Sequence, residues 1–290
     1  MKYVIFPKGK QTQFLIETKE KTKKSWEKLA QILKVSRSMI FFYRNEHSKL
    51  PRKHYLTLCR LTNTKIDLSL RTMQIKNKSE KIKIPSLTEK FAEFLGALAG
   101  DGHMNKITYE ISISMDKDLD KKYSMHVLKL YKDLFGITAR TYTQKECNKI
   151  KCFAYSKEVV NHLSSTYSVP IGKKKGNLKI PKQIKSNKPL LRAYIRGLFD
   201  TDGSIHRHHP KTAMLGIISR DPIFIKEVKQ ALLTLNFTTS LSNKNLYIYK
   251  KKEIDKFFKE IKPSNVKHNY KYTYYKKHQR VPLTKELIKR

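Results

Sequence analysis

Cysteine and acidic residues are both scarce in this chain of 290 residues. Its three cysteines, Cys59, Cys147 and Cys152, form no Cys-x-x-Cys pair, which argues against a disulfide framework and a structural zinc site. No apolar run approaches the roughly 20 residues of a membrane span, and the N-terminal stretch, interrupted by Pro7, lacks the features of a secretory signal. We therefore expect no membrane partner and an intracellular location, in the cytoplasm, the nucleoid or an organelle matrix.

The shortage of acidic residues leaves a large excess of positive charge. Against 24 Asp and Glu stand 62 Lys and Arg, which gives a formal net charge of +38. Such a charge exceeds what solubility requires and indicates a polyanionic partner. Because the charge is spread along the whole length and interleaved with apolar residues, it is typical of a folded basic protein rather than a disordered arm.

The N-terminal region predicts a small all-α domain. Helical periodicity runs through Trp26, Leu29 and Leu33, resumes after Ser36, and is followed by a third helix after Pro51. The short first connection and the polar, basic second helix favour a helix-turn-helix that enters the major groove of DNA, with Arg37 and Arg44 as contacts. A plain three-helix bundle with solvated basic faces is the alternative. A lysine-rich linker follows, and residues 1–80 are assigned to this domain and its linker.

Beyond the linker the chain repeats itself. The first copy contains the run FLGALAGDGH from Phe94, and the second contains IRGLFDTDGS from Ile195. After each run the periodicity changes in the same order, which predicts two αββαββα repeats over residues 81–185 and 186–290. The expected architecture is therefore α+β, a pseudo-twofold pair of repeats in a chain that acts as a monomer.

Each run predicts a helix that ends in Asp-Gly. Small residues lie four apart, as in Gly96 and Gly100, and this spacing lets two helix backbones approach closely. The glycine after each aspartate can adopt the left-handed conformation that ends a helix. This places Asp101 and Asp202 at helix C-termini, where the helix dipole opposes a carboxylate and the two acids repel each other. One such motif is explained by an ordinary helix end, but two copies in a basic chain favour a shared cation such as Mg²⁺.

At these residues the chain resembles the two-repeat, single-chain LAGLIDADG homing endonucleases, closely in the second run and more loosely in the first. The resemblance implies antiparallel sheets that form a saddle over double-stranded DNA and Mg²⁺-dependent hydrolysis of phosphodiester bonds at a long asymmetric site. It implies that Asp101 and Asp202 bind metal and act in catalysis, with the carbonyls of Gly100 and Thr201 as further ligands. Asp200 matches a noncatalytic position of the family.

The same resemblance directs attention to a basic residue before an Ile-Pro pair upstream of the second run. Lys179 holds that position and is the candidate for polarising water or stabilising charge on the phosphate. Arg280, before Val-Pro, is its counterpart after the second repeat and a candidate DNA contact. A solvated phosphate contact is an equally good interpretation of Lys179, because lysines crowd this segment. The neighbouring candidates for DNA contact are Lys173, Lys174 and Lys175.

Two further groups of residues are candidate DNA contacts. His206 and His208 follow the second acid in a region better suited to phosphate contact than to metal binding, because no HxxxH or cysteine partner accompanies them. The predicted strands alternate polar and apolar residues, so that Ser112 or Arg140 reaches base edges from the outer face.

Other functions remain open at this stage. A DNA-binding regulator without catalysis, or an RNA-splicing maturase whose partner is intron RNA, would keep the same fold. An unrelated basic RNA-binding protein would have no reason for paired Asp-Gly helices. An intein is disfavoured, because the sequence begins with Met1 and ends in Lys289-Arg290 without the His-Asn ending that protein splicing needs.

Overall fold

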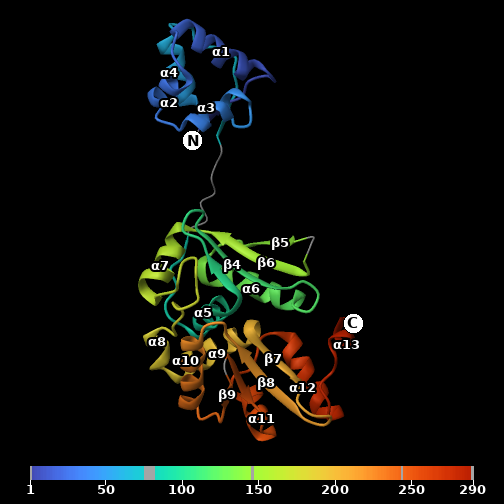
Figure 1. The fold of residues 1–290 in the computed structure, drawn as a ribbon. Coiled ribbons are helices and arrows are strands. Elements are labelled where there is room, and N and C mark those ends of the chain that lie inside the picture. Colours follow the sequence, from blue (N-terminus) through green and yellow to red (C-terminus); the bar gives the residue numbers. More distant parts are fainter. Residues whose placement is uncertain (1, 75–81, 145–146, 243, 289–290) are drawn as a thin grey trace. The chain divides into compact units, whose positions relative to one another are not determined.

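The chain forms two compact units, residues 1–79 and 80–290, in the computed structural model (Figure 1). The structure describes residues 2–74, 82–144, 147–242 and 244–288. Within these ranges no helix is long and apolar enough to cross a membrane. Each unit has its own hydrophobic core, so each is described by itself.

In its described residues, 2–74, the first unit contains four helices around one small core. Its elements are β1 (Lys2–Val4), α1 (Lys10–Thr22), α2 (Trp26–Leu33), α3 (Arg37–Arg44), α4 (Arg52–Leu61) and β2 (Thr72–Gln74). The three helices predicted after residue 24 are present. Serine hydroxyls cap two of them, since Ser25 Oγ accepts from Lys28 N at 3.1 Å and Ser36 Oγ accepts from Met39 N at 3.3 Å. A short antiparallel pairing of β1 with β2 supplements the predicted helices.

The second unit contains the two predicted repeats. The first consists of α5 (Glu89–Asp101), β3 (Gly102–Met104), β4 (Glu110–Asp116), α6 (Lys121–Phe135), β5 (Arg140–Gln144), β6 (Lys149–Tyr155) and α7 (Lys157–Tyr167). The second consists of α9 (Lys188–Asp202), β7 (Gly203–Arg207), β8 (Ala213–Ile218), α10 (Pro222–Thr234), β9 (Ser240–Ser242), β10 (Asn245–Ile248) and α11 (Lys251–Glu260). Short α8 (Lys182–Lys185) lies between them, and α12 (Val266–His278) and α13 (Thr284–Ile288) follow.

Both repeats build the same antiparallel sheet. The strand order is β3-β4-β6-β5 in the first and β7-β8-β10-β9 in the second. In each sheet the short strand that follows the motif helix forms one edge, and one continuous apolar core extends through both repeats. The predicted α+β fold, with two αββαββα repeats that follow a helical N-terminal unit in the sequence, is confirmed.

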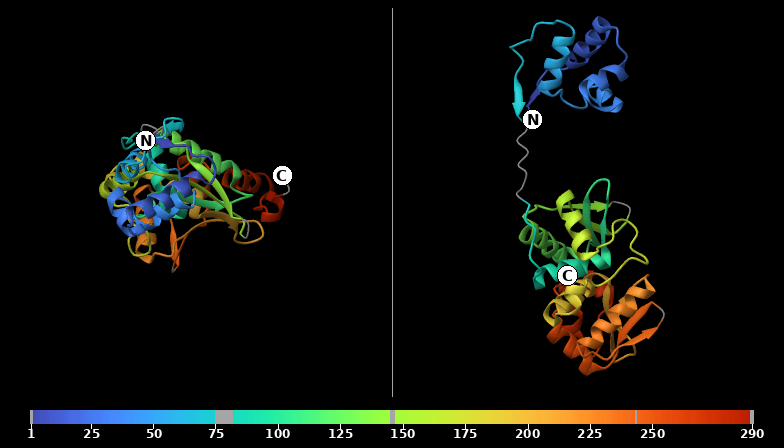
Figure 2. Two further views of the ribbon diagram at one scale, coloured as in Figure 1. Left: turned by 90° about the horizontal axis from the view of Figure 1, so that it is seen from above. Right: turned by 90° about the vertical axis from the view of Figure 1, so that its left-hand side faces the viewer.

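Helices α5 and α9 pack directly on each other where the repeats meet (Figures 1 and 2). A Cβ atom on Gly96 would overlap the backbone carbonyl of Tyr194, and one on Gly197 would overlap the carbonyl of Glu93. No side chain fits between the backbones at these two points. The small residues in the two runs therefore serve the close helix packing that their spacing predicts.

The glycine after each acid has a different role from the one expected. Gly102 has φ −84° and ψ 162°, and Gly203 has φ −89° and ψ 159°, so neither adopts the left-handed conformation. Instead, a Cβ on Gly102 would overlap the carbonyl of Leu98, and one on Gly203 would overlap Phe199. Glycine is needed because the chain turns into the next strand against the last turn of its own helix.

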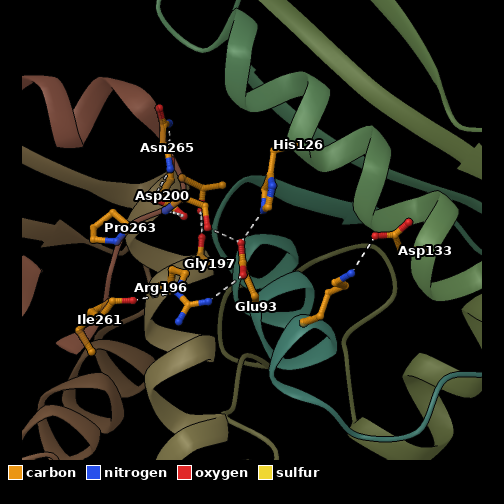
Figure 3. Close-up of polar contacts among 12 residues, drawn as sticks. Glu93, His126, Asp133, Arg196, Gly197, Asp200, Ile261, Pro263 and Asn265 are labelled. Atoms are coloured by element: carbon orange, nitrogen blue, oxygen red, sulfur yellow. Dashed lines mark hydrogen bonds and ion pairs between the residues drawn. The ribbon is translucent and has the colours of Figure 1, made fainter. Parts of the chain in front are cut away.

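A buried polar network ties the repeats together on one side of the helix pair (Figure 3). Glu93 of α5, which is 4% exposed, accepts hydrogen bonds from Arg196 Nη1 at 3.1 Å, His126 Nε2 at 2.7 Å and Ser264 Oγ at 2.8 Å. Arg196 Nε also donates to the carbonyl of Ile261 at 2.8 Å. The ion pair and its hydrogen bonds link α5 and α6 of the first repeat with α9 of the second and the segment that follows α11.

Asp200 belongs to the same network. Its carboxylate accepts from the backbone N–H groups of Ser264 at 2.9 Å and Asn265 at 3.0 Å, and it is 1% exposed (Figure 3). Asn265 Nδ2 in turn donates to Asp120 of the first repeat at 2.7 Å. This buried structural environment agrees with the noncatalytic position inferred for Asp200.

Candidate functional site

The two motif helices bring Asp101 and Asp202 to one pocket. Each acid is the last residue of its helix. The pocket has a volume of about 420 Å³, and both acids line it together with Gly100, Lys174 and Lys175. The carboxyl carbon of Asp202 would lie 3.3 Å from a Cβ on Gly100, so the second acid sits against the end of the first helix.

The pocket disfavours negative charge on both acids. Burial raises the pKa of Asp202 to about 7, the charge of Asp101 adds to the rise, and Lys174 opposes it. Burial also raises the pKa of Asp101, although part of this residue is exposed to solvent. Here Lys174 again opposes the rise and Asp120 adds to it. A cation bound between the two carboxylates would therefore stabilise their charged forms.

Lys174 lines the same pocket, and its charge acts on both acids. Its ammonium donates to the carbonyls of Ala99 at 2.8 Å, Gly102 at 2.9 Å and Leu98 at 3.3 Å, and also to that of Gly100. The carbonyls of Leu98, Ala99 and Gly100 belong to the last turn of α5, where helix carbonyls lack a partner within the helix and the dipole favours a cation, and Gly102 follows directly after the helix. Burial lowers the pKa of Lys174, and the charges of Asp202 and Asp101 oppose that shift.

The loop that carries Lys174 is held from the second repeat. Gly176 N donates to Asp221 Oδ2 at 2.6 Å, and Asp221 also caps α10 by accepting from the backbone of Ile223 at 3.0 Å. Gly172 and Gly176 have φ values of +78° and +84°, in the left-handed region that favours glycine. The Gly-Lys-Lys-Lys-Gly segment thus bends tightly, and its middle lysine reaches the carbonyls at the end of α5 in the pocket that the acids line.

The donor set of the pocket fits a hard divalent cation. Among the residues that the structure describes, no group of three or more His, Cys, Asp or Glu gathers to hold a metal ion. Two carboxylates alone suit Mg²⁺, which usually keeps waters and binds substrate phosphates beside one or two protein carboxylates. The carbonyl of Gly100, which was expected to be a further metal ligand, accepts a hydrogen bond from the Lys174 ammonium. Thr201 uses its hydroxyl inside α9, where it donates to the carbonyl of Leu198 at 3.1 Å.

The other lysines of this segment lie at different places. Lys175 lines the pocket and is exposed, and Lys173 is exposed next to it. Lys179 is also exposed and lines a separate small pocket against Leu95 and Val169. From the sequence, Lys174 was expected to contact phosphate and Lys179 to act in catalysis. In the structure, Lys174 lines the pocket of both acids, whereas Lys179 lines a different pocket. The two flanking glycines are the local signal that could have singled it out.

The candidate contacts on the two sheets differ in how accessible they are. Ser112 is only 3% exposed in the middle of its sheet, whereas Arg140 on the edge strand is exposed. His206 hydrogen-bonds Ser204 through Nδ1 at 3.2 Å, and its pKa is lowered by burial and by the charge of Lys271. His208 is exposed, and its ring lies 4.1 Å from that of His209, measured between centroids.

Three predicted arginine contacts already have partners within the protein. Arg280 forms an ion pair with Glu286, at 2.7 Å between Nη2 and Oε1. In the N-terminal unit, the Arg44 guanidinium lies 4.8 Å from the ring centroid of Phe41, and that of Arg37 lies 5.9 Å from the same centroid. Arg37 is nevertheless exposed at the start of α3, the second helix of the helix-turn-helix-like pair.

Comparison with protein families identifies the second repeat. Residues 189–262 match the family model of the LAGLIDADG-like domain. This range covers α9 from its second residue to its terminal Asp202, the whole second sheet and α11. For the second repeat, this match confirms the resemblance to the LAGLIDADG family that the sequence predicts.

Curated relatives match only through a small part of their length. The replication factor C small subunit of Methanocaldococcus jannaschii is 31% identical over 157 residues, which are 54% of this chain and 8% of that protein. A component of the A-type ATP synthase of Pyrococcus abyssi is 30% identical over 141 residues, 48% of this chain and 13% of that protein. The chain thus spans only a small part of the length of these relatives, and the activities named for the whole proteins do not transfer to it.

Two solved structures resemble the chain over about two thirds of its length. The N-terminal LAGLIDADG domain of DUF199/WhiA has 20% sequence identity and a TM-score of 0.44, covering 65% of this chain and 94% of that one. The homing endonuclease I-DmoI in complex with DNA and Mn has 16% identity and a TM-score of 0.42, covering 61% of this chain and 97% of that one.

Proposed function

We propose that this protein, whose second repeat is a LAGLIDADG-like domain, is a metal-dependent endonuclease that cuts double-stranded DNA at a long, asymmetric site. The observation that carries the proposal is the meeting of Asp101, Asp202 and Lys174 in one pocket at the end of the helix pair. The charge of +38 supports a nucleic-acid substrate, since Lys and Arg would neutralise phosphates along the duplex.

The residues of the pocket would have different roles in this reaction. Asp101 and Asp202 would hold Mg²⁺, with waters and substrate phosphate completing its ligands. The bound ion would supply an activated water and stabilise the leaving oxygen of the phosphodiester. Lys174 would offset the charge of both acids and stabilise negative charge that develops on the scissile phosphate. Arg140, Lys173 and Lys175 would contact the phosphate backbone on either side.

The test uses a pool of duplex DNA fragments with Mg²⁺ or with EDTA. The full chain is expected to cut in Mg²⁺ and not in EDTA. Asp101→Asn and Asp202→Asn should each nick or lose most cleavage, while their DNA binding in EDTA stays close to that of the wild type. Cleavage at the wild-type rate by the double variant would refute the assignment.

One observation, the position of Lys174 against the end of α5, favours a second function. An ammonium that hydrogen-bonds the carbonyls at the end of α5 already offsets both acids without a metal ion. A DNA-binding regulator, or a maturase that binds intron RNA, would keep this arrangement and cut nothing. The same experiment separates the two, because tight, specific binding without Mg²⁺-dependent products supports this second candidate.

A further inference from the structure

The segment that carries Lys174 is attached to both repeats. Near its start, Gly172 N donates to the carbonyl of Met104, on β3 of the first repeat, at 2.8 Å. Near its end, Gly176 N donates to Asp221 Oδ2 at 2.6 Å. Asp221 belongs to the second repeat, where it directly precedes α10 and is 2% exposed. Lys174 therefore lies midway between two backbone anchors, one on each repeat.

A tight turn couples the second anchor to Lys174. Asn177 N donates to the carbonyl of Lys174 at 2.9 Å, and Asn177 Nδ2 donates to that of Lys173 at 3.2 Å. Gly176 is the third residue of this turn, and its φ of +84° has the sign that a type II turn requires there. A movement of Gly176 away from Asp221 would therefore redirect the backbone at Lys174, two residues earlier.

The two carboxylate oxygens of Asp221 serve different elements. Oδ1 caps α10, since it accepts from Ile223 N at 3.0 Å and from Phe224 N at 3.2 Å. Oδ2 accepts from Gly176 N in the connecting segment. An amide or hydroxyl oxygen caps a helix as well as a carboxylate does, so capping alone does not require an acid here. The second oxygen, which holds the segment, is what aspartate adds at this position.

The first repeat makes the reciprocal contact. Asp120 directly precedes α6, as Asp221 directly precedes α10. Its Oδ1 accepts from Asn265 Nδ2 at 2.7 Å and lies 2.8 Å from Lys267 Nζ, and both of these residues follow α11. Each repeat thus uses the acid before its second helix to hold the segment that follows the last helix of the other repeat. Two independent contacts of this kind indicate that the exchange belongs to the design of the repeat pair.

We propose that Asp221 is a positioning residue, which holds the Lys174 ammonium at the end of α5 by fixing Gly176. Without this tether the segment keeps its anchor on the first repeat, but the ammonium loses its fixed place against the helix-end carbonyls. The lysine is therefore in position only while the two repeats are packed together. In the endonuclease proposed above, on which the kinetic part of this inference rests, loss of the tether removes a stabilising charge from the pocket of Asp101 and Asp202.

Amine labelling of the full chain tests the position of Lys174 without DNA or metal. Brief acetylation by N-hydroxysuccinimide acetate, with the sites located by tandem mass spectrometry, should modify exposed Lys173 and Lys175 faster than Lys174. Asp221→Asn keeps an oxygen for the cap of α10 but places an amide NH2 group against Gly176 N. In this variant the labelling of Lys174 should rise about fivefold, as expected for the loss of one hydrogen bond that holds the segment. The labelling of its two neighbours should not change.

Ser156→Ala is the matched control, because it removes the cap of α7, where Ser156 Oγ accepts from Val159 N at 3.2 Å, and leaves the tether intact. Lys174 should be labelled in this control as in the wild type. If circular dichroism shows that Asp221→Asn does not fold, Asp221→Ser replaces it, since serine also caps a helix but offers one oxygen in place of two. Unchanged labelling of Lys174 in the folded Asp221 variant overturns the proposal.

Cleavage gives a second readout, which separates positioning from stability. Asp221→Asn should slow single-turnover cleavage at least about tenfold, because a misplaced group loses much of its effect, while DNA binding in EDTA stays at the wild-type level. Added to Lys174→Ala, the same substitution should cost little more, since an effect carried through the lysine is lost only once. Losses that multiply in the double variant would contradict the inference. If the chain cuts no DNA, the endonuclease proposal fails, and the labelling still decides the role of Asp221.

Discussion

Gly197 lies so close to Glu93 across the helix pair that a Cβ on the glycine would overlap the backbone carbonyl of the glutamate. A backbone atom inside a packed helix has no room to move aside, unlike the end of a flexible side chain. The contact therefore joins the two repeats through their main chains, and it makes glycine at this position a requirement of the fold.

Substitution of Gly197 by alanine should destabilise the second unit strongly. The added methyl group forces α5 and α9 apart, and overpacking of this kind costs about 3 kcal/mol. Urea denaturation followed by circular dichroism measures the loss. Gly216→Ala is the control, because the atoms nearest its Cβ would belong to side chains and not to a backbone, the nearest in His206 at 3.3 Å and the next in Ser204 at 3.4 Å. Equal midpoints for the two variants would contradict this account of the helix pair.

Glu93→Gln should break the buried network between the repeats. The substitution leaves Arg196 without its charged partner in a site where the arginine side chain is 19% exposed, and loss of one member of a buried pair costs about 3 kcal/mol. Asp133→Asn removes the exposed pair with Lys90 and should cost less than about 1 kcal/mol. A similar loss in both variants, measured in urea, would show that the network adds no stability.

Glu93 and Asp202 should give the stability of the protein opposite slopes with pH. Burial works to raise the pKa of Glu93, but the hydrogen bond and charge of His126, with Ser264 and Arg196, hold it below its usual value of 4.5. Its contribution is present above that pH and is lost on acidification. Burial raises the pKa of Asp202 to about 7, so the folded state binds more protons than the unfolded chain from about pH 4 to 7. Its contribution falls as the pH rises through that range.

Denaturation midpoints measured across pH test both signs. Asp202→Asn should flatten the decline between pH 4 and 7, whereas Glu93→Gln should flatten the acid limb. Asp133→Asn serves again as the control, since its carboxylate is exposed at the surface beside Lys90. A decline towards neutral pH that survives in Asp202→Asn would rule out this carboxyl as its source.

Lys174→Ala should reduce cleavage more than Lys179→Ala. The first variant removes the ammonium beside both acids and should slow the reaction about 100-fold, as loss of one stabilising donor does in other active sites. The second removes an exposed lysine of the same connection and should leave the rate close to that of the wild type. Single-turnover cleavage at saturating Mg²⁺ makes the comparison. A larger loss of rate in Lys179→Ala would instead support Lys179, which precedes an Ile-Pro pair, as the lysine that acts in catalysis.

The sequence predicted the repeated elements well, because their periodicity is strong. The apolar spacing over residues 121–135 predicts a helix, α6 has those bounds, and Gly136 ends it with φ +71°. Helices α1 and α12 were not expected, since polar residues dominate both and few of their side chains are buried. Strand β2 begins inside the predicted linker, and residues 75–81 lie outside the described ranges. These short or polar elements depend on tertiary contacts that local patterns do not record.

The site was predicted in part for the same reason. Asp101 and Asp202 are marked by the repeated Asp-Gly ending, which is a local signal. Lys174 is one of three consecutive lysines, and its distinction arises from carbonyls more than seventy residues away in the chain. The role of Gly102 was misjudged because crowding by Leu98 is invisible until the helix and the following strand are placed together.

At Gly96 and Gly197 no side chain lies between α5 and α9. This direct backbone contact also determines how the second unit responds to mechanical force. Interfaces filled by side chains can shear as rotamers change, but two backbones in direct contact have no such compliance. The two sheets should therefore turn as one stiff body, with the angle between them set by the helix pair. If the protein holds a duplex across both sheets, the bending required for fit falls on the DNA, and sequences that bend easily would be bound in preference.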